Sequence, residues 1–69
     1  LDCLKIDQSF VKNITTNKND RVITSAIINM AHSLSLNVIA EGVEDKEQYQ
    51  LIKDAGCDVI QGYYFGKPL

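Results

Sequence analysis

The sequence lacks a cluster of positive charge, a long apolar segment and a recognisable cysteine motif. Seven Lys and Arg residues against nine Asp and Glu residues give a net charge of -2, and the basic residues are scattered. A polymeric nucleic acid is therefore not an expected partner. No apolar run approaches the length of about 18 residues that spans a bilayer, and no basic region followed by an apolar core opens the chain. We expect neither a membrane span nor a secretion signal.

The two cysteines, Cys3 and Cys57, do not form a CxxC arrangement. With His32 as the single histidine, they cannot complete a tetrahedral zinc site. A disulfide between them would need an oxidising compartment. We favour two reduced, mostly buried thiols and hence a cytoplasmic location, which is compatible with a parent protein that is attached to the membrane.

The chain has 69 residues, of which 45% are hydrophobic and 23% are charged. This composition is typical of folded globular proteins rather than of disordered, collagen-like or coiled-coil chains. A domain of this size buries only about 60% of the surface of its unfolded chain and is marginally stable by itself. We therefore expect the chain to be part of a larger fold.

Three short segments have the residue pattern of strands. They are residues 1–10, 37–40 and 58–61, the last of which is followed by Gly62. In the first segment Leu4 and Ile6 share one face of the predicted strand. Lys5 and Asp7 share the other face, so their charges point the same way.

The segment between the first two strands has helical periodicity. After a polar loop over residues 13–19, we expect a helix that is capped by Asn19 or Asp20. Its predicted buried stripe consists of Ile23, Ile27, Met30 and Leu34, widened by Val22, Ala26 and Ala31.

A second helix is predicted between the second and third strands. Asp45 and Gln48 have the spacing of a capping box at its start, and Gly56 is placed to end it in a left-handed cap. Tyr49, Ile52 and Ala55 make up its predicted buried stripe.

Strands that alternate with helices imply parallel pairing through right-handed crossovers, and hence an α/β fold of three parallel strands and two helices. In such folds, ligands bind at the carboxyl ends of the strands. The predicted strands end near Asp7, Glu41 and Gln61. Because a polar residue stands at each end, we predict a functional site at this edge of the sheet.

Glu41 closes an apolar strand, and Gly42 and Glu44 follow it. An ionised carboxylate at the end of a buried run is costly unless a cation or strong donors meet it. Glu41 is suited to bind magnesium or manganese, but further ligands are needed. Equally, Glu41 fits the first solvated residue of a loop, and Glu44 fits a residue that stabilises the next helix through its dipole.

Lys5 stands between two apolar residues, which predicts a partly enclosed ammonium group that needs Asp7, a phosphate or a metal-bound hydroxide as its partner. A solvated lysine on an edge strand is the alternative. Gln61 could position a water or a polar substrate group, or could bond to neighbouring backbone. His32 lies off the apolar stripe, and we expect it to be exposed and without a role. The aromatic run over residues 63–65 suits core packing better than stacking on a base.

Four blocks of sequence together resemble the C-terminal part of EAL domains, the bacterial phosphodiesterases of cyclic di-GMP. They are residues 4–11, 38–44, 56–58 and 61–69. The resemblance implies that residues 1–69 are a fragment of a single EAL domain. In its (β/α)₈ TIM-type barrel they would supply the last three strands and the two intervening helices.

The resemblance also implies a two-metal hydrolysis of cyclic di-GMP to linear pGpG with Mg²⁺ or Mn²⁺. In this family Lys5 matches the lysine that contacts the attacking water or the scissile phosphate, and Asp7 the aspartate that supports it. Glu41 matches a glutamate at the second metal, Gln61 a glutamine that positions water or substrate, and Glu44 a loop glutamate that shapes the site.

Two local departures from the family are Gln8, where Arg is common, and Ser35, where Gly often ends the helix. The Glu-Ala-Leu signature, the early metal ligands and the paired aspartates of the family are not among these residues. We therefore expect the chain to be a fragment of a longer protein and to be inactive in isolation. Most metal ligands would lie elsewhere in the parent protein, which could also contain sensor or cyclase domains.

Two other readings of the sequence remain open. The parent could be a degenerate EAL domain that binds cyclic di-GMP as a receptor or serves as an interaction module without catalysis. The fragment could also self-associate, because an incomplete parallel sheet leaves strand edges unpaired.

Overall fold

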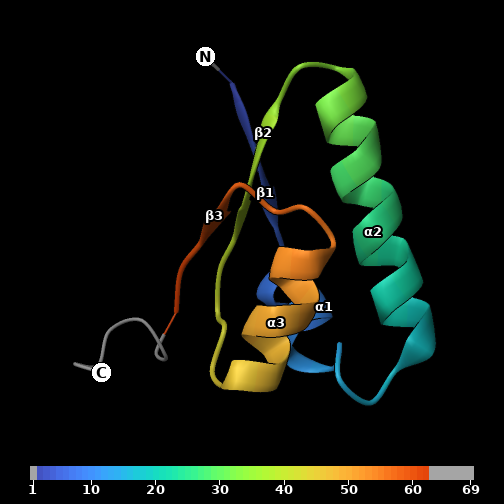
Figure 1. Ribbon diagram of the computed structural model, residues 1–69, viewed down its shortest axis with the longest axis vertical. Coiled ribbons are helices and arrows are strands. Elements are labelled where there is room, and N and C mark those ends of the chain that lie inside the picture. Colours follow the sequence, from blue (N-terminus) through green and yellow to red (C-terminus); the bar gives the residue numbers. More distant parts are fainter. Residues whose placement is uncertain (1, 63–69) are drawn as a thin grey trace.

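The computed structural model describes residues 2–62 as a parallel sheet with helices on one side (Figure 1). The elements in chain order are β1 (Cys3–Ile6), α1 (Gln8–Lys12), α2 (Lys18–Ser33), β2 (Asn37–Ala40), α3 (Lys46–Asp54) and β3 (Val59–Ile60). The predicted alternation of strands and helices is confirmed. The short helix α1 was not predicted.

The three strands are parallel and lie in the order β1-β2-β3. In the last paired row, Ile6 is beside Ala40, and Ala40 is beside Ile60. Ile6 and Ala40 are buried in the core, together with residues of the helices. Because side chains alternate along a strand, Lys5, Ile39 and Val59, which precede this row, point to the opposite side of the sheet.

The core lies between the sheet and the helices. Its buried hydrophobic residues are Ile6, Val11, Ile14, Ile28, Ala31, Val38, Ala40, Val43 and Ile52. They lie in each of these helices and strands except the two-residue strand β3. The loops after α1 and β2 also contribute one residue each. Burying this much apolar surface is the main favourable contribution to folding.

The predicted buried stripe of α2 is wrong for most of its residues, although Ala31 is buried and Ile27 packs against the core as predicted. The helix buries Thr24, Ile28 and Ala31, whereas Met30 and Leu34 are 57% and 66% exposed. Val22 and Ile23 are exposed as well. The helix has apolar residues over a wide arc, and only its packing against β2 and α1 selects the part that is covered. Periodicity alone could not make that choice.

Helix α1 begins directly after β1, because Asp7 caps it. The Asp7 carboxylate accepts a hydrogen bond from the Ser9 N–H at 3.1 Å, and Val11 is buried against the core. A helix of five residues is too short to show helical periodicity, and the residues before it alternate as in a strand. The sequence pattern therefore did not reveal α1. The predicted polar loop before α2 ends earlier than expected, since Asn17 rather than Asn19 or Asp20 caps that helix.

The two cysteines are free thiols, but only one is sheltered. Cys57 is partly buried and Cys3 is exposed, which contradicts the prediction that both are mostly buried. Burial raises the pKa of the Cys57 thiol, so this group stays protonated at neutral pH. None of the helices in the described part of the chain combines the length and apolar character that crossing a membrane requires.

Helices α2 and α3 end in the same hydrogen-bond pattern, a Schellman motif. After α2, the Ser35 N–H donates to His32 O at 3.0 Å and the Leu36 N–H donates to Ala31 O at 2.9 Å. After α3, Gly56 is the corresponding left-handed residue, with a φ of 100°, as predicted. Ser35 adopts a φ of 62°. This serine therefore stands where glycine is preferred.

We expect Ser35→Gly to raise the free energy of unfolding by up to about 1 kcal/mol, because glycine removes the steric cost of the left-handed conformation. Ser33→Gly is the matched control, since Ser33 is exposed and lies within α2. It should lower the free energy of unfolding by about 0.5–1 kcal/mol. Urea unfolding measures both variants, and a loss of stability in Ser35→Gly would contradict the assignment.

Candidate functional site

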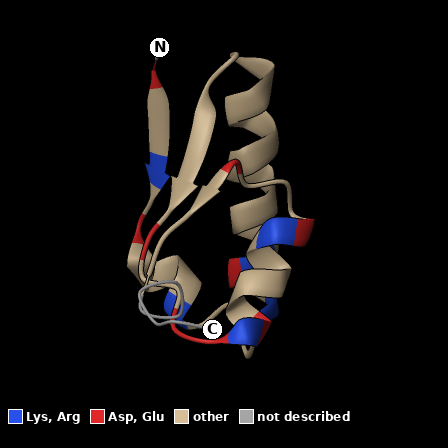
Figure 2. Ribbon diagram, turned by 60° about the vertical axis from the view of Figure 1, so that its left-hand side comes forward, with Lys and Arg blue, Asp and Glu red and all other residues tan. Residues whose placement is uncertain are grey.

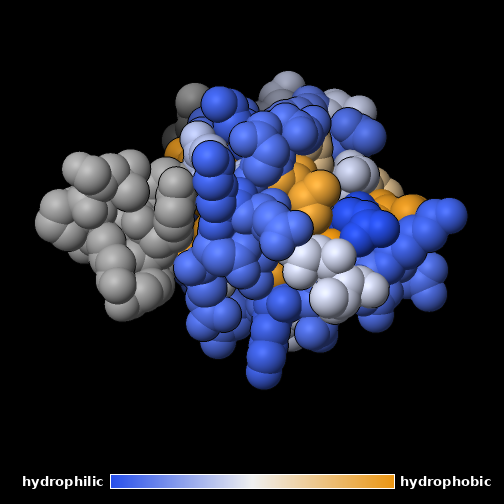
Figure 3. Space-filling view, turned by 60° about the horizontal axis from the view of Figure 1, so that its bottom comes forward, coloured by the Kyte–Doolittle hydropathy of each residue, from blue (hydrophilic) through white to orange (hydrophobic). Residues whose placement is uncertain are grey.

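The parallel register places the three predicted strand-end residues on one level. Asp7, Glu41 and Gln61 each follow directly after the last paired row of the sheet. Charged residues accordingly lie at the same end of β1 and β2 (Figure 2). This end of the molecule is mainly hydrophilic, with a small apolar area near its centre (Figure 3).

Lys5 and Glu41 form an ion pair across β1 and β2. The Lys5 Nζ lies 3.3 Å from the Glu41 Oε2, and the two side chains are 66% and 44% exposed. Both belong to the face of the sheet that the helices leave uncovered. The expectation of an enclosed lysine is therefore wrong for this chain, and the anion beside it is Glu41 rather than Asp7. Asp7 instead uses its carboxylate to cap α1.

A pocket of about 430 Å³ opens between the start of α1 and the loop after β2, and neither Lys5 nor Glu41 is among its lining residues. It is lined by Asp7, Gln8, Ser9, Lys12, Gly42 and Glu44. Asp7 and Glu44 were predicted site residues, whereas Ser9 and Lys12 were not. Their place in the pocket depends on α1, which the sequence pattern did not reveal.

Gly42, in the loop after β2, lies directly against Gln8, at the start of α1. A Cβ added to Gly42 would lie 2.7 Å from the Gln8 Cβ, and Gly42 has a φ of 79°. Only glycine allows this close approach together with a left-handed backbone. The loop after Glu41 is thus held directly against α1.

Gln61 is fixed by its backbone on both sides of the loop. Its N–H donates to Ala40 O at 2.8 Å, and its carbonyl accepts from the Val43 N–H at 3.2 Å. A Cβ on the following residue, Gly62, would overlap the backbone of Val43. Gln61 and Gly62 therefore lie directly against Val43, in the loop that follows β2.

The other end of this loop is held by Gln48, from α3. The predicted capping box is confirmed, because the Gln48 N–H donates to Asp45 Oδ1 at 2.8 Å and the Gln48 Oε1 accepts from the Asp45 N–H at 3.3 Å. The same oxygen accepts from the Glu44 N–H at 2.6 Å. Gln48 is 4% exposed. A buried amide thus holds Glu44 at the rim of the pocket.

The donor set in residues 2–62 suits part of a metal site. Glu41 offers a partly exposed hard oxygen ligand at the carboxyl edge. No group of three or more Asp, Glu, His or Cys residues within the described part could hold a metal ion together. A divalent cation at Glu41 would therefore need ligands from outside these residues.

Two other sequence predictions have different outcomes. The aromatic run over residues 63–65 lies outside the described residues. His32 is exposed, as predicted, but it has a structural partner, because its Nε2 lies 2.8 Å from the Asp58 Oδ2. The spacing of these residues in the chain gave no signal of this pairing, which depends on how α2 packs beside the start of β3.

Comparison with known proteins identifies the family. Residues 1–68 match the EAL domain model. The chain belongs to the EAL domain family. It is 53% identical over 66 residues to the signaling protein YkoW of Bacillus subtilis, covering 96% of this chain and 8% of YkoW. It is 45% identical over 69 residues to the cyclic di-GMP phosphodiesterase NbdA of Pseudomonas aeruginosa, covering 100% of this chain and 9% of NbdA.

Solved EAL structures share this fold. The PaMucR phosphodiesterase in complex with c-di-GMP matches with a TM-score of 0.90 at 35% identity, over 99% of this chain and 28% of that chain. BlrP1 of Klebsiella pneumoniae, in manganese and calcium complexes with c-di-GMP, matches with a TM-score of 0.86 at 27% identity, over 90% of this chain and 16% of that chain. The three strands and their helices are thus part of the TIM-barrel fold of EAL domains.

The EAL chain described here spans less than a tenth of the two curated relatives. Among these relatives, NbdA is named for cyclic di-GMP phosphodiesterase activity. The family of the chain is therefore established, and its fold matches that of solved EAL domains.

Gly62→Ala should lower the free energy of unfolding by about 1–3 kcal/mol, because the added methyl group must displace the backbone of Val43. Gly56→Ala is the comparison variant, since the nearest side-chain atom to its new Cβ lies at 3.7 Å. That variant carries only the backbone penalty of about 1 kcal/mol. Urea unfolding tests the difference, and a smaller loss in Gly62→Ala would refute the close contact.

Proposed function

We propose that residues 1–69 are the C-terminal part of an EAL domain whose parent protein hydrolyses cyclic di-GMP to linear pGpG with Mg²⁺ or Mn²⁺. The observation that carries this proposal is the meeting of Lys5, Glu41 and Gln61 at one edge of the sheet. Lys5 and Glu41 are in contact, and the register brings Gln61 to the level of Glu41. These are the residue types that a phosphodiester hydrolysis requires.

The similar proteins support cyclic di-GMP as the ligand. NbdA carries this substrate in its name, and the MucR and BlrP1 structures hold c-di-GMP. The pocket between α1 and the loop after β2 lies at the carboxyl edge, where ligands of parallel α/β folds bind. We infer that it accommodates part of the dinucleotide, with the remaining contacts made by the rest of the domain.

Each proposed residue has a role that its chemistry allows. Glu41 provides an anionic oxygen for a divalent cation, which when bound stabilises phosphate charge and activates water. The Lys5 ammonium, 3.3 Å from Glu41, attracts the scissile phosphate or the attacking water. The Gln61 amide can donate to and accept from that water. The catalytic residues are thus Lys5, Glu41 and Gln61, with Glu41 also the metal ligand.

Asp7 and Glu44 support the site from its rim. Asp7 holds the start of α1 through its bond to the Ser9 N–H, and both residues line the pocket. Glu44 is held by Gln48, so it shapes the loop beside Glu41.

The parent protein provides what these residues lack. We propose that most metal ligands and the remaining barrel strands come from the rest of the EAL domain, and that sensor or cyclase domains complete the parent. In isolation, residues 1–69 leave the outer edge of β1 without a partner among the described strands. We therefore propose that the isolated fragment self-associates and has no activity.

Glu41→Gln in the full-length protein should lower kcat for cyclic di-GMP by about 100-fold or more, because loss of even a supporting partner of a metal ligand typically costs about 10–100-fold. Glu47→Gln is the matched control, because Glu47 is exposed in the first turn of α3. It should retain the parent's activity. Residues 1–69 alone, assayed beside them, should show no turnover.

The outcome separates the enzyme from the receptor. Binding of cyclic di-GMP without turnover by the wild-type parent would favour a degenerate EAL domain. Full activity in Glu41→Gln would show that Glu41 takes no part in the reaction. Turnover by residues 1–69 alone would contradict the proposal that most of the site lies elsewhere.

A chelator should abolish hydrolysis of cyclic di-GMP by the full-length protein, and added Mg²⁺ or Mn²⁺ should restore it. The reason is that a carboxylate and an amide cannot by themselves generate hydroxide near neutral pH. Dialysis against EDTA followed by assays with each metal makes the measurement. Undiminished turnover after complete removal of metal would exclude the two-metal reaction.

A further inference from the structure

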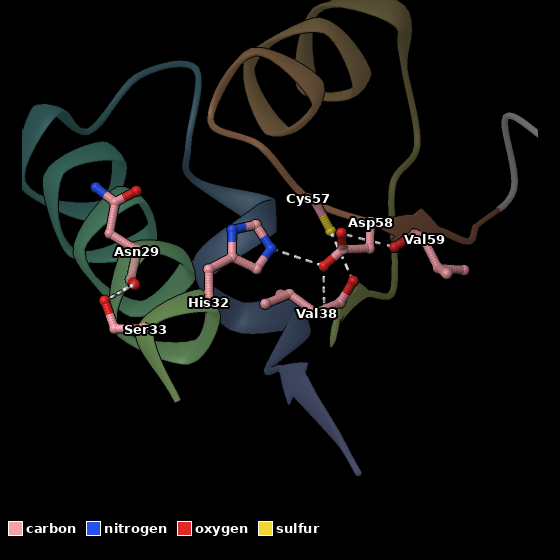
Figure 4. A network of polar contacts seen from close by, with 7 residues as sticks. All are labelled: Asn29, His32, Ser33, Val38, Cys57, Asp58 and Val59. Atoms are coloured by element: carbon pink, nitrogen blue, oxygen red, sulfur yellow. Dashed lines mark hydrogen bonds and ion pairs between the residues drawn. The ribbon is translucent and has the colours of Figure 1, made fainter. Parts of the chain in front are cut away.

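Asp58, directly before β3, contacts Val38 near the start of β2 (Figure 4). Its Oδ2 accepts a hydrogen bond from the Val38 N–H at 2.7 Å, and its own N–H donates to Val38 O at 3.1 Å. The Cys57 thiol donates to the same carbonyl at 3.3 Å. Both backbone polar groups of Val38 are thus bound by two consecutive residues.

The His32 ring holds the Asp58 carboxylate from the other side. An ionised carboxylate can only accept, so the His32 Nε2–H donates to Asp58 Oδ2 over 2.8 Å. This bond lowers the pKa of Asp58 below its ordinary value, so the carboxylate is ionised at neutral pH. The Asp58 Oδ2 therefore links His32, in the last turn of α2, to the backbone N–H of Val38 in β2 (Figure 4).

Strand β3 has only two residues, Val59 and Ile60. They pair with Ile39 and Ala40, and two pairs set a register weakly. The backbone bonds of Gln61 hold the chain directly after these pairs, and Asp58 adds a contact directly before them. A slip by one residue would turn every side chain of β3 to the opposite face of the sheet.

The register of β3 decides where Gln61 lies. Gln61 follows Ile60 directly and donates its N–H to Ala40 O at 2.8 Å. A slip by one residue would move it by about 3.3 Å along the strand direction. A misplacement of only about 1 Å can reduce a rate by about 100-fold. The contact at Asp58 is therefore coupled to the site through three residues of extended chain.

We propose that Asp58, oriented by His32, is a positioning residue that sets the register of β3 on β2 and thereby places Gln61 at the level of Glu41. It touches neither substrate nor metal and acts only through Gln61. Its consequence for turnover rests on the proposed function, whereas its effect on the sheet does not.

Two variants of the full-length protein separate positioning from charge. Asp58→Ala removes the oxygen and should lower kcat by about tenfold or more, with KM for cyclic di-GMP changed far less. Asp58→Asn keeps an oxygen that can accept from both Val38 and His32, and its kcat should stay within about threefold of wild type. Amide hydrogen exchange at Gln61 should be faster in the alanine variant and near wild type in the asparagine variant.

His32→Ala covers the case in which Asp58→Ala does not fold. It removes only the His32 bond to Asp58 Oδ2 and leaves the Val38 bond in place, and the His32 side chain is partly exposed. It should speed exchange at Val38 and Gln61 and lower kcat, and His32→Gln, which retains a donor, should restore part of both. Wild-type exchange at Gln61 in both alanine variants would overturn the proposal, as would a kcat in Asp58→Asn as low as in Asp58→Ala.

The two proposals fail in different ways. If the wild-type parent does not turn over cyclic di-GMP, the proposed function fails, and the exchange data alone still decide whether Asp58 sets the register. The wild type could be active while the Asp58→Ala variant loses only thermal stability and keeps its kcat at a temperature where it is folded. That result would overturn the positioning role of Asp58 and leave the proposed enzymatic function intact.

Discussion

The parallel register of three short strands is the constraint on which the rest of this structure depends. None of the strands within residues 2–62 exceeds four residues, so none of them is stable alone, and each owes its position to its neighbours and to the helices that pack on the sheet. Because Ile6, Ala40 and Ile60 share one row, the next residue of each strand arrives at the same edge. The candidate site is a direct consequence of that row.

The loop after β2 shows how the fold prepares this edge. Gly42 lies against α1, Val43 is held by the backbone of Gln61, and Glu44 is held by the amide of Gln48. Helix α1, the residue after β3 and the first turn of α3 thus fix a short loop before any ligand arrives. A site that is held in this way has less conformational entropy to lose on binding.

The clearest predictions from the sequence concern local features. The capping box at Asp45 and the left-handed cap at Gly56 are present as expected, because both depend on residues within a few positions of each other. The buried face of α2 was predicted wrongly, since its apolar residues allow more than one orientation. His32 was judged idle, because its partner Asp58 is 26 residues away in the chain.

By itself, the sequence determined the order of strands and helices, the caps of α3, the polar residue at each strand end and the family to which the chain belongs. These properties follow from short-range patterns and from residues that stand next to one another. Only the tertiary structure decided that Lys5 pairs with Glu41, that α1 lines a pocket and that Asp58 joins α2 to the sheet. The reason is that such contacts form between side chains whose distance is set by the register and the packing of whole elements.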